Sequence, residues 1–213
     1  GSADLAGPNK TVLKNCDGIF NPQNRKGRTI EFGIREFAMS AVVSGMNLHG
    51  GLRPFCATFL VFADYLRAQL RVAALMNLPN IYVLTHDSIY VGEDGPTHQP
   101  VETLASLRAI PNVQVLRPAD AQETLEAWKM AYESKNHPVC IALTRQAIQG
   151  FAKADKDWKN SIRKNGAYVA LDCEGTPEIT ILATGSEVST SIEAASISGN
   201  KKIRVVSVID YNK

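Results

Sequence analysis

Short apolar runs of strand type alternate with helical stretches along most of this chain, and this alternation restricts the fold more than any other feature. The apolar runs cover residues 81–85, 113–116 and 139–143, and segments with helical spacing separate them. Strands that alternate with helices favour a parallel sheet with helices on both faces. The sequence therefore predicts an α/β fold with a doubly wound, mainly parallel sheet.

The first two helical stretches are rich in apolar residues. Apolar residues recur at helical spacing from residue 37 to the Gly50-Gly51 pair, and no acidic residue occurs between Phe37 and Ala63. Because a surface helix normally has charges on its outer face, we expect the first helix to be buried all round. Residues 58–76 are predicted to form the second helix.

Two further helices are predicted before the third apolar run. The shorter covers about residues 101–108. Asp120 and Glu123 have the spacing of a capping box, in which the two side chains bind backbone N–H groups at the start of a helix. This second helix is expected to end near Ser134.

The last third of the chain predicts a change of domain. Residues 151–165 are charged and are typical of a linker, after a first domain over 1–150. Beyond them, residues 178–183 and 203–209 are of strand type and flank one helix. One β-α-β unit is too small to cover a sheet on both faces, so we interpret 166–213 as an incomplete second α/β domain. The absence of an initial Met fits a piece of a longer protein.

Charge and composition exclude several kinds of partner. The 23 Lys and Arg residues are balanced by 21 Asp and Glu residues, a net charge of +2. This balance provides no strong field for nucleic acid or an anionic membrane, and no apolar run approaches the ~20 residues of a membrane span. The four cysteines are isolated, without metal or redox spacing, and are typical of reduced thiols in the cytoplasm.

Two predicted strands end at residues that could bind an anion. His86 follows the run 81–85, and Arg145 follows the run 139–143. Open parallel sheets bind ligands beyond the carboxyl ends of their strands, so the two side chains are expected to face one crevice. An arginine fork and an imidazole together suit a phosphate group. The alternative is that each residue makes only local hydrogen bonds.

The 14-residue loop from Asp87 to Pro100 is long for a compact domain, which favours a functional role. It contains Asp94 as an acceptor and His98 as an acid or base near neutral pH. A metal site made of these two residues with His86 and Asp87 is a weaker hypothesis, because the spacing fits no standard site. A solvated turn is the alternative.

Glu36 begins the first helix on a face of small, uncharged residues, opposite the stripe of Phe37, Ala41 and Gly45. Such a face suits close packing against another surface, where a carboxylate would be desolvated and its pKa raised. The alternative is an exposed glutamate at a helix N-terminus, favoured by the helix dipole.

Three aromatic residues, Phe59, Phe62 and Tyr65, recur every three positions on the predicted second helix. A core role is the usual meaning of such a stripe. The sequence contains no glycine-rich phosphate loop, nucleophile elbow or Cys–His pairing signal, so patterns alone do not identify a reaction.

Several motifs in register over residues 1–150 resemble the pyrimidine-binding domain of transketolases. The most specific is Gly92-Glu-Asp-Gly-Pro-Thr-His-Gln-Pro100. The others are Gly1–Leu5, Gly33–Met39, Leu48–Gly51, Thr58–Tyr65, Thr85–Ile89 and Thr144–Gln146. The remainder, through Ala183-Thr-Gly-Ser-Glu-Val188, resembles the start of the C-terminal domain of the same family.

The resemblance implies a thiamine diphosphate cofactor and a role for each matching residue. Glu36 would be catalytic, by a hydrogen bond to the aminopyrimidine ring that activates the cofactor. His98 would be the second catalytic residue, at the reaction centre. The implied cofactor-binding residues are Asp4, Leu5, Glu36, Phe59, Phe62 and Tyr65, and the implied substrate-binding residues are His86, Asp94, His98 and Arg145.

The resemblance also implies what lies outside this chain. The family works as a cytoplasmic homodimer, with the active site between subunits, and moves a two-carbon ketol unit between sugar phosphates. The ligands of Mg²⁺ or Ca²⁺ and of the diphosphate belong to an N-terminal domain, so none is assigned here and this segment alone is expected to be inactive. The alternatives are a related transferase such as a dihydroxyacetone synthase and a non-catalytic homologue.

Two residues depart from the family pattern. Pro8 stands where a serine usually contacts the substrate phosphate, and Tyr90 replaces a glycine beside the substrate loop. Proline has neither a hydroxyl nor an N–H group. Both departures concern the phosphate end of the site.

Overall fold

The computed structural model describes all residues 1–213, and its larger sheet has four parallel strands. In spatial order these are β1 (Phe55–Phe59), β2 (Ile81–Thr85), β4 (Val139–Ala142) and β3 (Gln114–Leu116). The predicted α/β fold with a mainly parallel sheet is confirmed.

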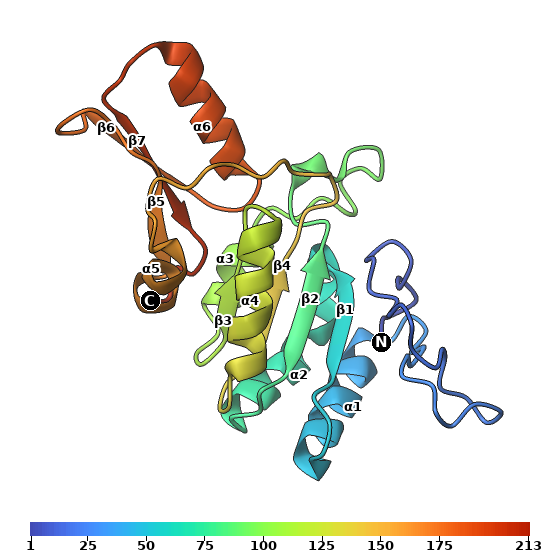
Figure 1. Cartoon of the computed structure of the whole chain (residues 1–213). Coiled ribbons are helices and arrows are strands. Elements are labelled where there is room, and N and C mark those ends of the chain that lie inside the picture. The colour runs from blue at the N-terminus through green and yellow to red at the C-terminus, as the bar shows by residue number, and fades with distance from the viewer.

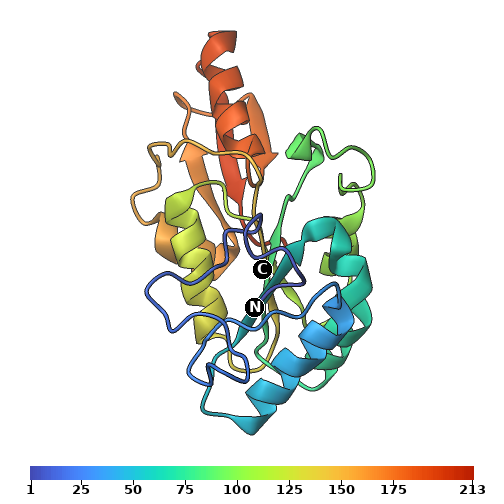
Figure 2. The same ribbon diagram turned by 90° about the vertical axis from the view of Figure 1, so that its right-hand side faces the viewer.

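Helices cover both faces of this sheet (Figures 1 and 2). α1 and α2 lie on one face and α4 on the other. Tyr82 and Leu84 of β2 face the core beneath α1 and α2, whereas Ile81 belongs to the core beneath α4, as the alternation of side chains along a strand requires. The helices are α1 (Glu36–His49), α2 (Ala63–Leu75), α3 (Thr103–Arg108) and α4 (Ala121–Glu133), with single-turn 3₁₀ helices at Leu60–Phe62 (η1) and Ile89–Val91 (η2).

The predicted helix over residues 58–76 is wrong in its first five residues. Thr58 and Phe59 complete β1, η1 follows, and α2 begins only at Ala63. β1 pairs along its whole length with β2, from Phe55 opposite Ile81 to Phe59 opposite Thr85. This pairing satisfies the backbone groups that a helix would otherwise satisfy, so Phe59 lies at a strand end and not on a helical stripe.

The expectation that the first helix is buried all round is also wrong. Phe37 is 52% exposed and Val42 is 44% exposed. The face that packs inward is the one that carries Glu36, together with small polar residues. Ser40 can face the core because its hydroxyl is hydrogen-bonded to the Tyr82 hydroxyl at 2.8 Å, which offsets the cost of burying it.

Asp120 and Glu123 cap the start of α4 as predicted, except that Glu123 binds the N–H group of Ala119 and not that of Asp120, the N-cap residue. The Asp120 carboxylate accepts a hydrogen bond from the Glu123 N–H at 2.8 Å. The Glu123 carboxylate accepts one from the Ala119 N–H, also at 2.8 Å. The helix ends at Glu133, with Ser134 as its C-cap.

Residues 1–35 form no helix and run beside the outer edge of β1. Ser2 makes parallel bridges with Ala57 and with Glu31, and the amino group of Gly1 donates a hydrogen bond to the Phe55 carbonyl. Asp4 and Leu5 are thereby held next to the start of α1.

A second, three-stranded sheet follows in the order β5-β7-β6. The expected β-α-β unit is present as β6 (Ile179–Ala183), α6 (Glu187–Ser198) and β7 (Ile203–Val208), with parallel strands. The sequence analysis missed β5 (Ala167–Leu171), which pairs antiparallel with β7. The segment interpreted as a linker holds helix α5 (Trp158–Asn165). None of the helices combines the length and hydropathy that a membrane span requires.

Buried side chains join the two sheets. Apolar residues of both, among them Leu116 of β3 and Val205 of β7, belong to one core cluster. At its centre the fully buried Glu123 carboxylate accepts hydrogen bonds from the Tyr168 hydroxyl at 2.6 Å and from the Ser207 hydroxyl at 2.9 Å. Burial raises the pKa of Glu123, and each of these donors reduces the cost of keeping the carboxyl group inside.

We expect Tyr168→Phe to destabilise the chain by about 1–3 kcal/mol, because the buried Glu123 carboxyl would lose a hydrogen-bond donor. Urea unfolding followed by circular dichroism measures the change. Tyr132→Phe is the matched control, since Tyr132 lies on α4 with 64% of its surface exposed. Equal shifts of the two unfolding midpoints would contradict a stabilising role for this contact.

Candidate functional site

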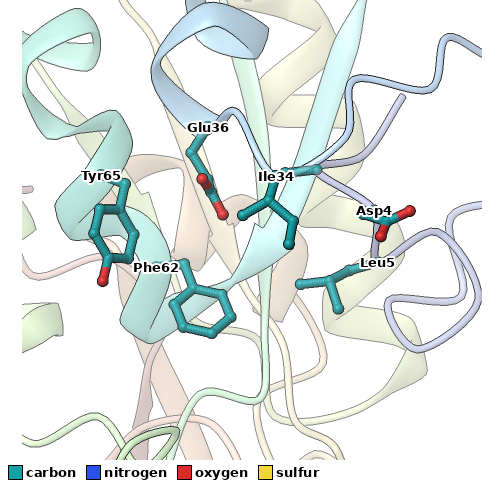
Figure 3. Close-up of a pocket in the computed structure, with 7 residues that line it drawn as sticks. Asp4, Leu5, Ile34, Glu36, Phe62 and Tyr65 are labelled. Carbon is teal, nitrogen blue, oxygen red and sulfur yellow. The ribbon is translucent and has the colours of Figure 1, made fainter.

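A cavity lies where the N-terminal segment, α1, η1 and α2 meet. Its volume is about 450 Å³, and its walls are mostly apolar. Figure 3 shows its side chains: Glu36 and Phe62 lie between Tyr65 on one side and Ile34 and Leu5 on the other, whereas the Asp4 carboxylate points away. The lining residues are Ala3, Asp4, Leu5, Ile34, Glu36, Phe62 and Tyr65.

Glu36 is the one buried carboxylate in this cavity. It is the first residue of α1 and is only 5% exposed. Its carboxylate lies between Tyr65 and Ile34 and points toward Phe62 (Figure 3), and no group of the chain donates a hydrogen bond to it. Because this carboxylate faces the cavity and has no donor from the chain, the cavity fits a ligand with an aromatic ring and a hydrogen-bond donor on it.

The aromatic residues form a continuous wall from the cavity to the ends of β1 and β2. Phe59 stacks on the His86 ring, with 3.7 Å between centroids and 24° between planes. Phe62 meets the His98 ring edge to face at 5.3 Å and lies 6.1 Å from the Tyr65 ring. Phe62 and Tyr65 therefore line the cavity and do not belong to the hydrophobic core, which is the usual place of such a stripe.

His86 is buried in a strained backbone conformation. It is 6% exposed, and its φ of 60° lies in the left-handed region that non-glycine residues rarely adopt. Its Nδ1 is 2.9 Å from the Thr85 hydroxyl. Burial above all lowers the pKa of His86; Asp94 opposes this shift, whereas Arg145 and His98 add to it.

The parallel pairing of β2 and β4 places the residues that follow these two strands at the same end of the sheet. His86 follows β2 and Arg145 follows β4, as the sequence analysis expected. Arg145 is 46% exposed and lies 3.8 Å from the exposed Glu93 carboxylate. Asp94 is exposed and His98 is half-buried, with its Nδ1 2.8 Å from the Thr97 hydroxyl.

The structure does not arrange His86, Asp87, Asp94 and His98 as a metal site. No three His, Cys, Asp or Glu side chains of the chain are arranged to hold a metal ion. The Asp87 carboxylate is instead paired with the buried Arg117, whose Nε donates a hydrogen bond to it at 2.7 Å.

Arg117 is a residue that the sequence analysis missed. It follows β3 directly, so the strand-end rule applied to His86 and Arg145 would also have selected it. It joins the two sheets, because its Nη1 donates to the Thr184 carbonyl at 3.0 Å and contacts Glu187 of α6. Arg117 is held by Asp87, Thr184 and Glu187, so its role is structural: it stabilises the contact between the two sheets next to the site.

The two residues that depart from the family pattern lie at the surface. Tyr90 is 56% exposed in η2. Pro8 is exposed and precedes the buried Asn9.

The lowered pKa of His86 makes a pH dependence of stability testable. The native chain favours the neutral imidazole, so this contribution is present above a pH of about 6.5, the ordinary value for histidine, and is lost as the pH falls below it. We expect the His86 ring resonances to titrate below pH 6.5 in NMR spectra. His86→Gln should reduce the loss of stability between pH 7 and 5.5; an unchanged loss would contradict this assignment.

Family models match both parts of the chain. Residues 1–150 match "Transketolase, pyrimidine binding domain". Residues 166–213 match "Transketolase-like TK C-terminal domain". The transketolase of Treponema pallidum (strain Nichols) is 57% identical over 209 residues, which are 98% of this chain and 31% of that relative.

Solved structures agree with the sequence matches. A crystal structure of transketolase from Pichia stipitis in complex with sedoheptulose 7-phosphate superposes with a TM-score of 0.92 at 40% identity, over 100% of this chain and 32% of that one. A more distant structure, the inactive β4 tetramer of a split gene transketolase, gives a TM-score of 0.69 at 31% identity, over 86% of this chain and 57% of that one. The chain thus spans about a third of the length of the curated relatives it matches. By its sequence and its fold, it belongs to the transketolase family.

Proposed function

We propose that this chain supplies the pyrimidine-binding domain, residues 1–150, and the start of the C-terminal domain, residues 166–213, of an active transketolase. The complete enzyme moves a two-carbon ketol unit from a ketose phosphate to an aldose phosphate. The observation that carries the proposal is the Glu36 carboxylate, which faces an apolar, aromatic-lined cavity and has no hydrogen-bond donor from the chain.

The cavity supports thiamine diphosphate as the ligand. When bound, this cofactor supplies the group that stabilises negative charge on the transferred carbon unit. Glu36 accepts a hydrogen bond from the pyrimidine ring and holds its proton in place. Phe62 and Tyr65 offer ring faces and edges to a planar heterocycle, Phe59 backs this wall, and Asp4 and Leu5 border the cavity on its other side.

The residues that follow β2 and β4, together with the loop after His86, support a sugar phosphate as substrate. Asp94 accepts a hydrogen bond from the hydroxyl next to the reacting carbonyl, and a substrate without that hydroxyl would leave the acceptor unpaired. His98, in contact with Phe62 beside the cavity, handles the protons of the carbonyl and hydroxyl. Arg145 and His86 bind the phosphate, for which an arginine fork is well suited.

A second subunit completes the site in this proposal. The apolar stripe of α1 that contains Phe37 and Val42 is exposed beside the Glu36 face, which fits a homodimer with the cofactor between subunits.

The Mg²⁺ or Ca²⁺ ion and the diphosphate are bound by a domain outside this segment, so the segment alone is inactive. The inactive split gene relative supports this last point. The free thiols of buried Cys56 and Cys140 fit the cytoplasm.

We expect Glu36→Gln to lower kcat of the complete enzyme by about 10²–10⁴-fold at saturating cofactor, because the amide cannot hold the ring proton as a carboxylate does. Glu31→Gln, at a nearby exposed position, is the matched control and should keep full activity. Turnover assays with a ketose phosphate donor measure both. Wild-type turnover in the Glu36 variant would refute the proposed catalytic role.

Arg145→Met should raise KM for phosphorylated substrates by about 10–100-fold, since a charge-assisted hydrogen bond contributes about 1.5–3 kcal/mol. KM for an unphosphorylated aldose should change little, because that substrate has no phosphate to bind. Arg71→Met, on the exposed side of α2, serves as the control. Equal increases for both kinds of substrate would assign Arg145 to another part of the sugar.

A further inference from the structure

A chain of four buried polar side chains leads from the N-terminal segment to His86. The Ser2 hydroxyl lies 3.0 Å from the Ala57 carbonyl oxygen, and the Asn9 amide lies 3.1 Å from the Ser2 hydroxyl. The Thr85 hydroxyl lies 2.6 Å from Asn9 Oδ1 and 2.9 Å from His86 Nδ1. Ser2, Asn9, Thr85 and His86 are each at most 6% exposed, so water does not compete for these contacts.

The backbone carbonyl at the far end fixes the direction of every hydrogen bond in this relay. A carbonyl only accepts, so the single hydroxyl proton of Ser2 points to Ala57. The Ser2 oxygen then accepts from the Asn9 amide NH₂ group, which leaves Asn9 Oδ1 toward Thr85. Oδ1 also only accepts, so the Thr85 proton is used there. The Thr85 oxygen must therefore accept a hydrogen bond from the group that remains, His86 Nδ1.

We propose that Asn9 and Thr85 are positioning residues that hold the free-state His86 as the Nδ1–H tautomer, with Nε2 as a bare acceptor. In the neutral ring only one nitrogen carries a proton. Nε2 makes no hydrogen bond within the chain, and stacking on Phe59 fixes the ring plane. This proposal rests on the proposed function only in giving His86 a sugar phosphate to bind.

The tautomer has a consequence for ligand protonation. A dianionic phosphate offers only acceptors, so it cannot form a hydrogen bond with a bare Nε2. A bond forms once one proton is added, either on Nε2 or on a phosphate oxygen. The complex therefore holds one proton more than the separate dianion and neutral histidine. The charged or titratable groups that act on this ring are Asp94, which favours the added proton, and Arg145 and His98, which oppose it.

The tautomer is tested in the 213-residue chain without any activity. In long-range ¹H–¹⁵N NMR spectra at pH 7.5, we expect His86 to carry its proton on Nδ1. Thr85→Val removes the acceptor and should populate the Nε2–H form, whereas Thr85→Ser keeps the hydroxyl and should retain the wild-type spectrum. A wild-type ring protonated on Nε2, or a Val variant that keeps the Nδ1–H tautomer, would overturn the proposal.

The proton uptake is tested in the complete enzyme. KM for a sugar phosphate should rise by about tenfold from pH 7 to pH 8, where the phosphate is already dianionic. This rise should be weaker in Thr85→Val, whose Nε2–H tautomer can donate directly, and restored in Thr85→Ser. A loss of structure alone would change kcat or stability, but it would not change how steeply KM rises with pH. If the KM of the wild-type enzyme does not depend on pH, the complex does not take up a proton and this part of the proposal is wrong.

The two tests separate this inference from the proposed function. If the NMR result is as expected but His86→Gln leaves KM for sugar phosphates unchanged, the relay exists and the phosphate role of His86 is wrong. If the enzyme is active and binds phosphate through His86 with an Nε2–H tautomer, the function stands and the relay is wrong.

Discussion

Parallel pairing of β1, β2, β4 and β3 is the constraint on which the candidate site depends. It brings the carboxyl ends of strands that are far apart in the sequence to one end of the sheet, where Phe59 stacks on His86 and where Arg145 follows the neighbouring strand β4. Both faces of such a sheet are buried under helices, so this end is where polar side chains can meet a ligand. The strained backbone of His86 is tolerated there because the strand before it is fixed by pairing on both sides.

The cavity beside this end combines two properties that a purely structural hollow would not need. Its walls are apolar and aromatic, yet Glu36 lies among them without a donor from the chain. The small polar face of α1 packs inward through Ser40 and Tyr82, and this packing sets the position of the carboxylate. The apolar stripe remains outside, next to the same site. The surfaces proposed for the ligand and for the second subunit therefore lie on adjacent faces of one helix.

The second sheet is tied to the first through buried polar groups as well as through shared apolar packing. Glu123 binds side chains of β5 and β7, and Arg117 binds Asp87, Thr184 and Glu187. Asp87 follows His86 directly, so Arg117 links the residue next to His86 to the second unit. Helix α5 adds Trp158 and Ile162 to the common core, which is why the segment before the second sheet is not an open linker.

The sequence by itself determined the α/β class, the α4 capping box and the strand ends at His86 and Arg145, because these follow from local periodicity and from chemistry a few residues apart. Its motifs also identified the family. Only the tertiary structure decided that Phe59 ends a strand, that the Glu36 face of α1 turns inward, and that β5 pairs antiparallel with β7. Each of these depends on partners distant in the chain: β2 for Phe59, Tyr82 for α1, and β7 for β5. Helical spacing describes one segment at a time, whereas burial is decided by what the rest of the chain places against it.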